Sequence, residues 1–247
     1  MTTAMNQIWD EINKIPPTTR FIILSTLSIT LISLPFPSLV GMHTALVLPQ
    51  IWRAFTCFFI LSKSLNGLFD LVILFRTSTD LEGSGGGRAG AAFAWGRIVD
   101  AMLILVLNYP INAYSLFRPF FLSLVYTQSL SSPHSHVNLF GLASIPNNIY
   151  PYVILAIDML LGGPVMVIVG LTGIIAAHFR HLMSISPSPV PAPLRSIIST
   201  PPSWFERWWI ATDAKERRTG YGTAYNPTQQ RTQAQAHSWG TGRRLAD

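Results

Sequence analysis

The chain has 247 residues, of which 49% are hydrophobic and 11% are charged, and its formal net charge at pH 7 is +6. Soluble domains carry about 25% charged residues, so this composition argues against an ordinary soluble domain and favours a membrane protein. A lone cysteine, Cys57, excludes an intrachain disulfide bond and a cysteine-based metal site.

The first twenty residues differ in character from the segment that follows them. They include Asp10, Glu11 and Lys14, and the apolar run after Arg20 is too long for the hydrophobic region of a cleaved signal peptide. We therefore expect residues 1–20 to form a cytosolic N-terminal segment.

Long stretches without Asp, Glu, Lys or Arg occupy most of the next 160 residues. The hydrocarbon core of a bilayer is about 30 Å thick, and roughly 20 helical residues cross it. The pattern predicts a membrane domain over residues 21–183, with six spans at Phe21–Val40, Arg53–Phe75, Ala91–Ile111, Tyr114–Leu130, Tyr150–Leu161 and Pro164–Met183.

The connections between these spans differ in length and composition. Those at 108–113 and 161–164 are so short that the helices on either side are expected to form antiparallel hairpins. The glycine-rich segment 77–90 predicts a flexible loop, and Pro35 and Pro37 are expected to bend the first span. Basic residues, among them Arg180, fall mainly on the side shared by the two ends, so both termini are expected in the cytosol.

Polar side chains inside the predicted spans suggest either structure or function. Lys63, Asn66 and Asp70 share one face of the second span, whereas Arg97 and Asp100 are spaced to pair with each other. Ionisable groups are costly in a bilayer. They indicate either salt bridges that hold the bundle or a water-filled groove that admits polar polypeptide, and both interpretations stay open. The later spans add Arg118 and Asp158.

Residues 184–247 have the composition of a disordered cytosolic tail. The proline-rich segment 186–193 predicts an extended spacer. The aromatic residues from Trp204 to Trp209 predict a short amphipathic helix at the membrane interface, and Tyr221–His237 is expected to be disordered. The positive charge of the tail favours anionic lipid headgroups over nucleic acid, since no nucleic-acid motif accompanies it.

Six short segments, in this order, resemble the derlins, which are relatives of rhomboid proteases in the endoplasmic reticulum. The resemblance extends over nearly the whole chain, although the sixth span has Ala177 where the family carries a second glycine. The segments are Ile15–Arg20, Gln50–Arg53, Leu65–Asp70, Asn138–Leu142, Gly173–Ala177 and Trp239–Leu245.

This resemblance implies an all-α membrane protein, a six-helix rhomboid-like transmembrane bundle with a flexible cytosolic tail. It implies roles for four groups of residues. These are a luminal-loop signature at Trp52 and Arg53, a polar groove at Lys63, Asn66 and Asp70, close helix packing at Gly173 and Ala177, and an ATPase-binding box formed by Trp239, Gly240, Gly242, Arg244 and Leu245.

Catalysis is not expected from these residues. A rhomboid protease pairs a serine on the fourth span, in a glycine-containing motif, with a histidine on the sixth. Neither Ser115 nor Ser123 has a neighbouring glycine, and His178 stands on the other side of the small-residue motif from the rhomboid histidine. His178 and His181 lie on one helical face, where we expect polar residues near the headgroups and no metal site. No cofactor is expected.

The leading hypothesis is therefore a non-catalytic component of endoplasmic-reticulum-associated degradation. Its expected partners are misfolded protein substrates, the valosin-containing AAA ATPase, a ubiquitin-ligase complex of the endoplasmic reticulum, membrane lipids and further copies or relatives of itself. The alternative is an active rhomboid-type intramembrane serine protease that uses Ser123 and His178. A small-solute transporter is a third hypothesis, but no inverted repeat supports it.

Overall fold

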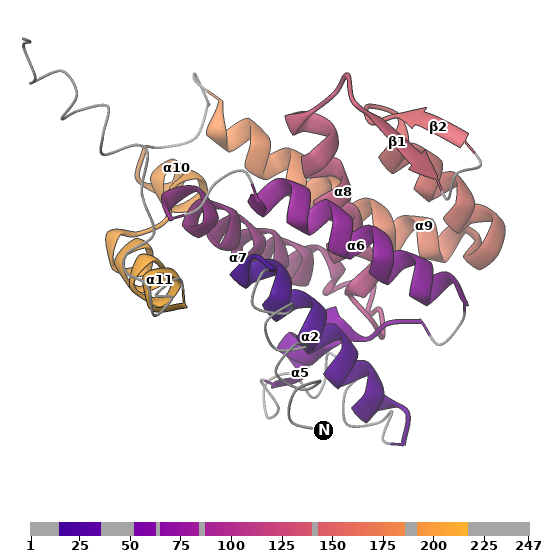
Figure 1. The fold of residues 1–247 in the computed structure, drawn as a ribbon. Coiled ribbons are helices and arrows are strands. Elements are labelled where there is room, and N and C mark those ends of the chain that lie inside the picture. The colour runs from indigo at the N-terminus through magenta and orange to yellow at the C-terminus, as the bar shows by residue number, and fades with distance from the viewer. Residues whose placement is uncertain are drawn as a thin grey trace, which may run out of the picture.

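The computed structural model describes residues 15–35, 52–62, 65–83, 87–139, 143–185 and 192–216. Within these ranges the chain is mainly helical, and one short antiparallel hairpin pairs His136 with Pro146 (Figure 1). The elements are α2 (Pro17–Ser33), α5 (Trp52–Thr56), the 3₁₀ turn η1 (Cys57–Phe59), α6 (Leu65–Gly83), α7 (Arg88–Asn108), α8 (Phe117–Ser131), β1 (His136–Leu139), β2 (Ala143–Pro146), α9 (Tyr150–Ser184), α10 (Ala192–Ser199) and α11 (Ser203–Glu216).

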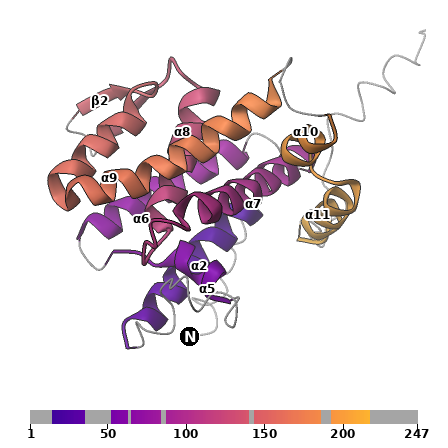
Figure 2. The ribbon, with the colours of Figure 1, turned by 180° about the vertical axis from the view of Figure 1, so that it is seen from behind.

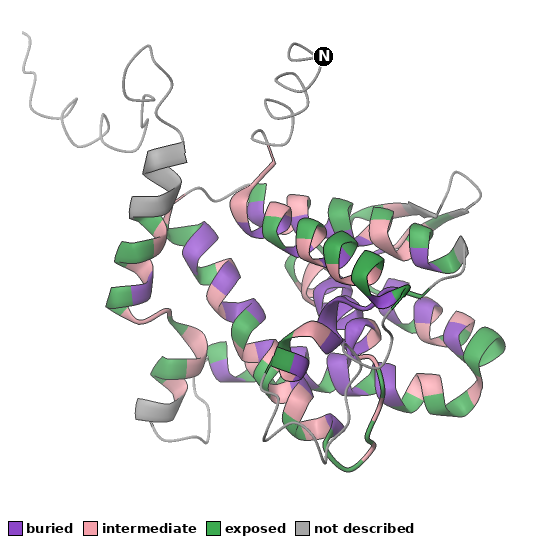
Figure 3. Ribbon diagram, turned by 90° about the horizontal axis from the view of Figure 1, so that it is seen from below, coloured by how far each residue is buried: buried purple, intermediate pink, exposed green. Residues whose placement is uncertain are grey.

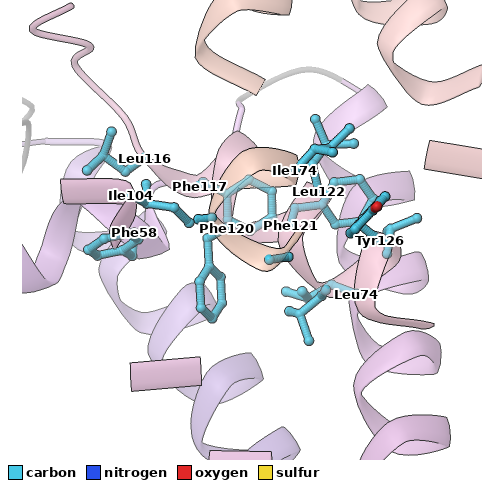
Figure 4. Packing of buried hydrophobic residues seen from close by; sticks show 14 of the residues in the cluster. Phe58, Leu74, Ile104, Leu116, Phe117, Phe120, Phe121, Leu122, Tyr126 and Ile174 are labelled. Carbon is cyan, nitrogen blue, oxygen red and sulfur yellow. The ribbon is translucent and has the colours of Figure 1, made fainter. Parts of the chain in front are cut away.

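Helix α8 forms the centre of the bundle. Ten of its fifteen residues are buried, and it packs most extensively against α9 and also contacts α6, α7 and η1. Figure 4 shows aromatic and aliphatic side chains of α8, among them Phe120 and Leu122, surrounded by Phe58, Leu74 and Ile174 from other elements. The first part of α8 is mainly apolar, and the buried hydroxyls of Ser123 and Ser129 are satisfied by backbone carbonyls of the same helix.

Large apolar side chains face outward from the surrounding helices, where Figure 3 shows exposed positions along their outer faces. Leu160 and Val106 are 85% and 70% exposed, respectively. Helices α7 and α9 are long and apolar enough to cross a membrane by length and composition, and α2 is a shorter apolar helix. Outward apolar faces on such helices are expected when the surrounding solvent is lipid.

Helix α2 begins and ends at features that the sequence contains. Pro16 precedes it and Pro17 occupies the first turn. Proline is tolerated there because the first backbone N–H groups of a helix have no acceptor within the helix. The helix ends at Ser33, before Pro35, so it stops where a bend was expected. Proline removes a backbone donor and clashes with the preceding turn. Pro37 lies outside the described residues.

The start of α2 is capped by a side chain from another helix. Glu82, in the last turn of α6, accepts hydrogen bonds from the backbone N–H of Thr18 at 2.8 Å and of Thr19 at 2.7 Å. It also accepts from both threonine hydroxyls. Its side chain is buried, and a carboxylate at a helix N-terminus satisfies orphan donors and the helix dipole together. Glu82 thus ties the start of α2 to the end of α6.

Replacing Glu82 with alanine should lower the stability of the folded chain by more than about 2 kcal/mol, because buried donors of α2 lose a charged acceptor. The matched control is Asp80→Ala on the same helix, since the bond of Asp80 with Gln128 is exposed and should contribute less than about 1 kcal/mol. Thermal unfolding of the purified protein measures both. Equal melting temperatures for the two variants would contradict the capping role.

The second predicted span, Arg53–Phe75, is wrong in its boundaries. The structure has two short helical segments at Trp52–Phe59, an extended connection at Ile60, and a new helix from Leu65 to Gly83. The backbone of Leu61 is held to α2 through Thr30, whose hydroxyl also donates to the Phe59 carbonyl. Helix α6 ends at Gly83, so it extends into the segment 77–90. The expectation of a flexible loop there is wrong for residues 77–83.

The fifth and sixth predicted spans are one ribbon in α9, broken at Gly163. This glycine has φ = 71°, a conformation that residues with a Cβ rarely adopt, and Pro164 follows it. A Cβ added at Gly170 would meet Leu155 and Asp158, so the two halves of α9 fold back against each other. The ribbon reverses there in Figure 2. The predicted antiparallel hairpin is confirmed.

The chain remains ordered beyond the expected boundary at Met183. Helices α10 and α11 pack against the bundle, α10 on α9 and α11 on α7, and both lie at the same end of α7 in Figures 1 and 2. The indole of Trp95 donates to the Ile197 carbonyl at 2.8 Å and its ring lies 5.3 Å from that of Phe205. The expectation of a disordered tail is therefore wrong for residues 192–216, where only a short helix over Trp204–Trp209 was predicted. Aromatic burial against α7 provides the physical reason.

Candidate functional site

Three helices bring a buried triad of charges together. Arg118, near the start of α8, contacts Asp70 of α6 at 2.7 Å between Nη1 and Oδ2. The Nε of Arg118 donates to Asp158 of α9 at 2.8 Å, and Nη2 donates to the other oxygen of that carboxylate. Asp158 is 1% exposed. One guanidinium thus bridges two carboxylates, which links α6, α8 and the first half of α9.

A second buried triad links α7 to the last part of α9. Arg97 contacts Asp100 at 2.8 Å, which confirms the pair predicted from their spacing, and Arg180 reaches the other oxygen of Asp100 at 2.8 Å. Both arginines also donate to the hydroxyl of Thr127 on α8. Sequence reasoning assigned Arg180 to the cytosolic rim and missed its partner. This pair could not be predicted from the sequence, because it depends on the packing of the second half of α9, which carries Arg180, against α7.

The two triads are opposite in charge. Asp70, Arg118 and Asp158 sum to −1, and Arg97, Asp100 and Arg180 sum to +1, if all six groups are ionised. Buried ion pairs are costly to desolvate and more costly to break. Their first consequence is structural, because Arg118 and Arg180 tie helices that are distant in sequence.

The predicted polar stripe of the second span is divided. Asn66 is exposed at the start of α6, whereas Asp70 is partly buried against Arg118. Lys63 lies outside the described residues. Asp70 therefore belongs to a salt bridge that holds the bundle, which is one of the two interpretations that the sequence left open. The assignment of Asn66 and Lys63 to a groove stays a prediction.

The predicted luminal-loop signature lies in the short helix α5. Trp52 is 55% exposed and Arg53 is 5% exposed. Phe58 and Phe59 continue the segment into the core, and the ring centroid of Phe59 lies 4.9 Å from that of the exposed Phe55. The signature therefore combines an exposed Trp52, a residue type favoured at membrane interfaces, with a buried Arg53.

The predicted close helix packing has a direct counterpart at Gly173. A Cβ at this position would collide with the backbone of Pro119, including its carbonyl oxygen. Ala177, one turn later, is fully buried in the core. Small residues at this spacing let two helix backbones approach closely, and here they seat α9 on α8.

Substituting Gly173 with alanine should destabilise the bundle by about 1–3 kcal/mol or more, because the added methyl meets backbone that cannot rotate away. Gly83→Ala is the control, since a Cβ added there, at the end of α6, would meet nothing within 4 Å. The measurement is the melting temperature in detergent. If Gly173→Ala has the melting temperature of the wild type, the close approach of α8 and α9 at this position does not contribute to stability.

The serine and histidine side chains of the alternative protease hypothesis have other partners. The Ser123 hydroxyl is buried and donates to the Phe120 carbonyl at 2.7 Å. The His178 ring Nδ1 lies 2.8 Å from the hydroxyl of Tyr126. The Ser115 hydroxyl donates to the Ile60 carbonyl at 3.0 Å. None of these three bonds is the serine–histidine contact by which a general base activates a nucleophile.

An apolar groove of about 800 Å³ lies between the first half of α2 and α7. The phenylalanines of α5 and η1, with Phe120 of α8, line it toward the core. Trp208 and Trp209 of α11 line it at the other end. Sequence patterns did not reveal it, because the groove depends on where α11 and η1 pack.

The predicted ATPase-binding box, residues 239–245, lies outside the described residues. Among the described residues, the contacts of Glu82, the Arg118 triad and the Arg180–Asp100 pair are those that sequence reasoning missed. The predicted spans contain three aspartates and five basic residues, so a basic partner for each aspartate was an available expectation.

The chain is similar to proteins of known family. Residues 15–202 match the Der1-like family model. Derlin-1.2 of Zea mays is 32% identical over 139 residues, which cover 55% of this chain and 56% of the maize protein. Derlin-1 of Arabidopsis thaliana is 30% identical over 181 residues, or 70% of this chain and 67% of that protein. An uncharacterised derlin-like protein of Schizosaccharomyces pombe is 28% identical over 201 residues, or 74% of this chain and 85% of that protein. The chain thus matches little more than half the length of the maize relative.

Proposed function

Because this chain belongs to the Der1-like family, we propose that it is a non-catalytic component of endoplasmic-reticulum-associated degradation. It helps misfolded proteins to cross the membrane toward a cytosolic AAA ATPase and the ubiquitin–proteasome system. The family match over residues 15–202 is the observation that carries the proposal. That match confirms the family resemblance and covers five of the six motifs, whereas Trp239–Leu245 lies beyond it.

The geometry of the described residues supports a binding role. Ser123 and His178 are engaged by a backbone carbonyl and by Tyr126, respectively. The bundle offers a lipid-facing groove and short inserted segments at Trp52–Phe59. Such features suit the handling of polypeptide within a bilayer better than hydrolysis, which needs an activated nucleophile.

We further propose six membrane spans with both termini in the cytosol of the endoplasmic-reticulum membrane. The two halves of α9 count as two spans because the ribbon reverses at Gly163. Helix α6 then returns the chain to the cytosolic side near Glu82, where this carboxylate caps the start of α2. The contact between the start of α2 and the end of α6 supports two antiparallel spans, since it places Pro17 and Gly83 on the same side of the membrane.

Cells that lack this protein should clear a misfolded luminal reporter slowly, and the Ser123→Ala, His178→Ala double variant should restore clearance as well as wild type does. The measurement is the reporter half-life after translation is blocked. The Ser123 hydroxyl is bonded to backbone, so a catalytic contribution is not expected. A serine-directed probe that labels wild type but not Ser123→Ala would instead establish the protease alternative. Unchanged reporter half-life in the deleted cells would reject the degradation role.

A further inference from the structure

Helix α11 forms part of the wall of the apolar groove. Phe205, Trp208 and Trp209 line the groove together with the first half of α2 and one face of α7. On α7 the groove is open at Ile98, which is 45% exposed, and closed one turn earlier at Ala94, which is 5% exposed. Helix α11 packs on α7 and lies at this end of it in Figures 1 and 2. It therefore covers the part of the groove where the α7 wall is buried.

The attachment of α11 to α7 depends mainly on one aromatic side chain. Among the α11 side chains that the structure describes, Phe205 is the buried one, and its ring lies 5.3 Å from that of Trp95. Glu206 adds an ion pair with Arg88 at 2.7 Å, but the arginine is exposed, and exposed ion pairs contribute little to stability. An attachment of so few buried groups can open locally while the rest of the bundle stays folded.

Helix α10 has an attachment of its own. The indole of Trp95 donates to the Ile197 carbonyl at 2.8 Å, and Nε of Arg195 donates to the Met183 carbonyl of α9 at 3.2 Å. Residues 200–202 link α10 to α11, and two of these three residues are prolines. Proline fixes φ, so rotation at this link falls on the ψ angles. Hinges commonly lie in a few residues between elements, and α11 can turn here while α10 stays in place.

The outer face of α11 favours a second position for this helix. Trp204 and Trp208 are 63% and 58% exposed while α11 is packed on α7. They are four residues apart, so they share one face of the helix. Tryptophan favours the headgroup layer of a membrane, which is where the sequence predicted this aromatic segment. That layer would also accept Phe205 and Trp209 if the helix left α7.

We propose that α11 is a hinged cover of the groove, which alternates between a closed position on α7 and an open position in the headgroup layer. The structure shows the closed position, which is held by Phe205 on Trp95. Opening about residues 200–202 exposes the groove at Ala94 to the leaflet next to α11. Such a cover operates whether or not the chain acts in protein degradation.

Distances between two spin labels, measured by double electron–electron resonance on the full chain in phosphatidylcholine nanodiscs, test the motion. Ala89→Cys on α7 and Arg207→Cys on α11 place the labels at exposed positions, and the native Cys57 is buried. This pair should give a main short distance and a longer one with a population below about a tenth. Adding Phe205→Ala should raise the open-to-closed ratio by about tenfold or more, because the buried ring is lost.

Two controls separate the motion of α11 from other changes. Ile210→Ala, at an exposed position of α11 outside the groove lining, should change the ratio by less than about twofold. A second label pair, Ala89→Cys with Ile197→Cys on α10, should keep one distance in every variant, since α10 does not move. If Phe205→Ala lowers the melting temperature, Glu206→Gln replaces it. Loss of the ion pair should shift the ratio in the same direction by about twofold.

Access to the groove is measured with a cysteine at its covered part. Ala94→Cys should react slowly with a soluble maleimide, and about tenfold faster when Phe205→Ala is added, because the rate follows the open fraction. An α11 distance that is single in the wild type and unchanged by Phe205→Ala and Glu206→Gln would overturn the proposal. Equal lengthening of the α10 distance would also overturn it, since the whole segment 192–216 would then detach. So would labelling of Ala94→Cys that does not follow the open fraction.

Discussion

Replacing Arg118 with leucine should prevent the chain from accumulating as a folded membrane protein. The substitution leaves Asp70 and Asp158 close together without their shared guanidinium. Removing one partner of a buried ion pair typically costs about 3–5 kcal/mol, and the total stability of a domain is only about 5–15 kcal/mol. Expression level and the monodisperse fraction on size-exclusion chromatography measure the loss.

Two variants separate charge from packing in this experiment. Asp70→Leu leaves the neutral pair of Arg118 and Asp158, so it should fold nearly as well as wild type. The triple leucine variant at 70, 118 and 158 removes all three charges and should recover much of the stability lost in Arg118→Leu. Arg88→Leu is the surface control, since the Arg88 side chain is 85% exposed. Wild-type accumulation of Arg118→Leu would show that the triad does not hold the bundle.

Asp70→Leu also tests the groove interpretation of the second span. If the variant folds normally but clears the misfolded reporter slowly, Asp70 has a role in substrate clearance besides its salt bridge with Arg118. If clearance is normal, its role is limited to the salt bridge that the structure shows. The two outcomes can be told apart only if the variant is stable. We expect Asp70→Leu to be stable because Arg118 keeps Asp158 as its partner.

Hydropathy predicted the helices well where a span is uniformly apolar, and less well where helices are short or broken. α7 and α8 lie within three residues of their predicted starts and ends. The segment Arg53–Phe75 was predicted as one span because it is mainly apolar. Its backbone instead becomes extended at Ile60, and the Leu61 N–H bonds to the Thr30 hydroxyl of α2. Hydropathy measures the transfer of residue types into lipid and cannot predict a hydrogen bond between distant segments.

The candidate site was predictable in its residue types but not in its pairings. Local spacing was sufficient for Arg97 and Asp100, which lie one turn apart on α7. It was insufficient for Arg118, whose partners come from α6 and α9 and are 48 and 40 residues away in sequence. Likewise, the aromatic run of α11 was assigned to the membrane interface, but its packing on Trp95 depends on tertiary structure.

The fold also changes the expected reach of the C-terminal peptide. Since α10 and α11 pack on the bundle, a linker can begin only after Glu216 instead of at residue 184. The composition of Tyr221–His237 predicts a flexible chain, whose root-mean-square length would be roughly 20–25 Å for 17 residues. This span would separate the peptide at 239–245 from the bundle, so that a large cytosolic partner need not touch the bilayer.

Truncation after His237 should abolish co-purification of the AAA ATPase while leaving membrane insertion unchanged. In the removed peptide, Trp239 and Leu245 can each fill an apolar pocket, and Gly240 and Gly242 allow the backbone to approach a partner closely. Arg244 can bind a carboxylate through two parallel hydrogen bonds. Ordering so short a segment costs entropy, so its affinity should be on the order of micromolar.

A synthetic peptide of residues 238–247 should bind the N-terminal domain of the ATPase in calorimetry, and Trp239→Ala should remove that binding. Thr241→Ala is the matched control within the same peptide and should bind within a few-fold of the native sequence, because no pocket or charge contact is assigned to its side chain. In cells, full recruitment of the ATPase by the truncated chain would place the contact on another subunit. Loss of recruitment together with loss of membrane insertion would instead show that residues 238–247 are needed for folding, and the peptide measurement then decides whether they bind the ATPase directly.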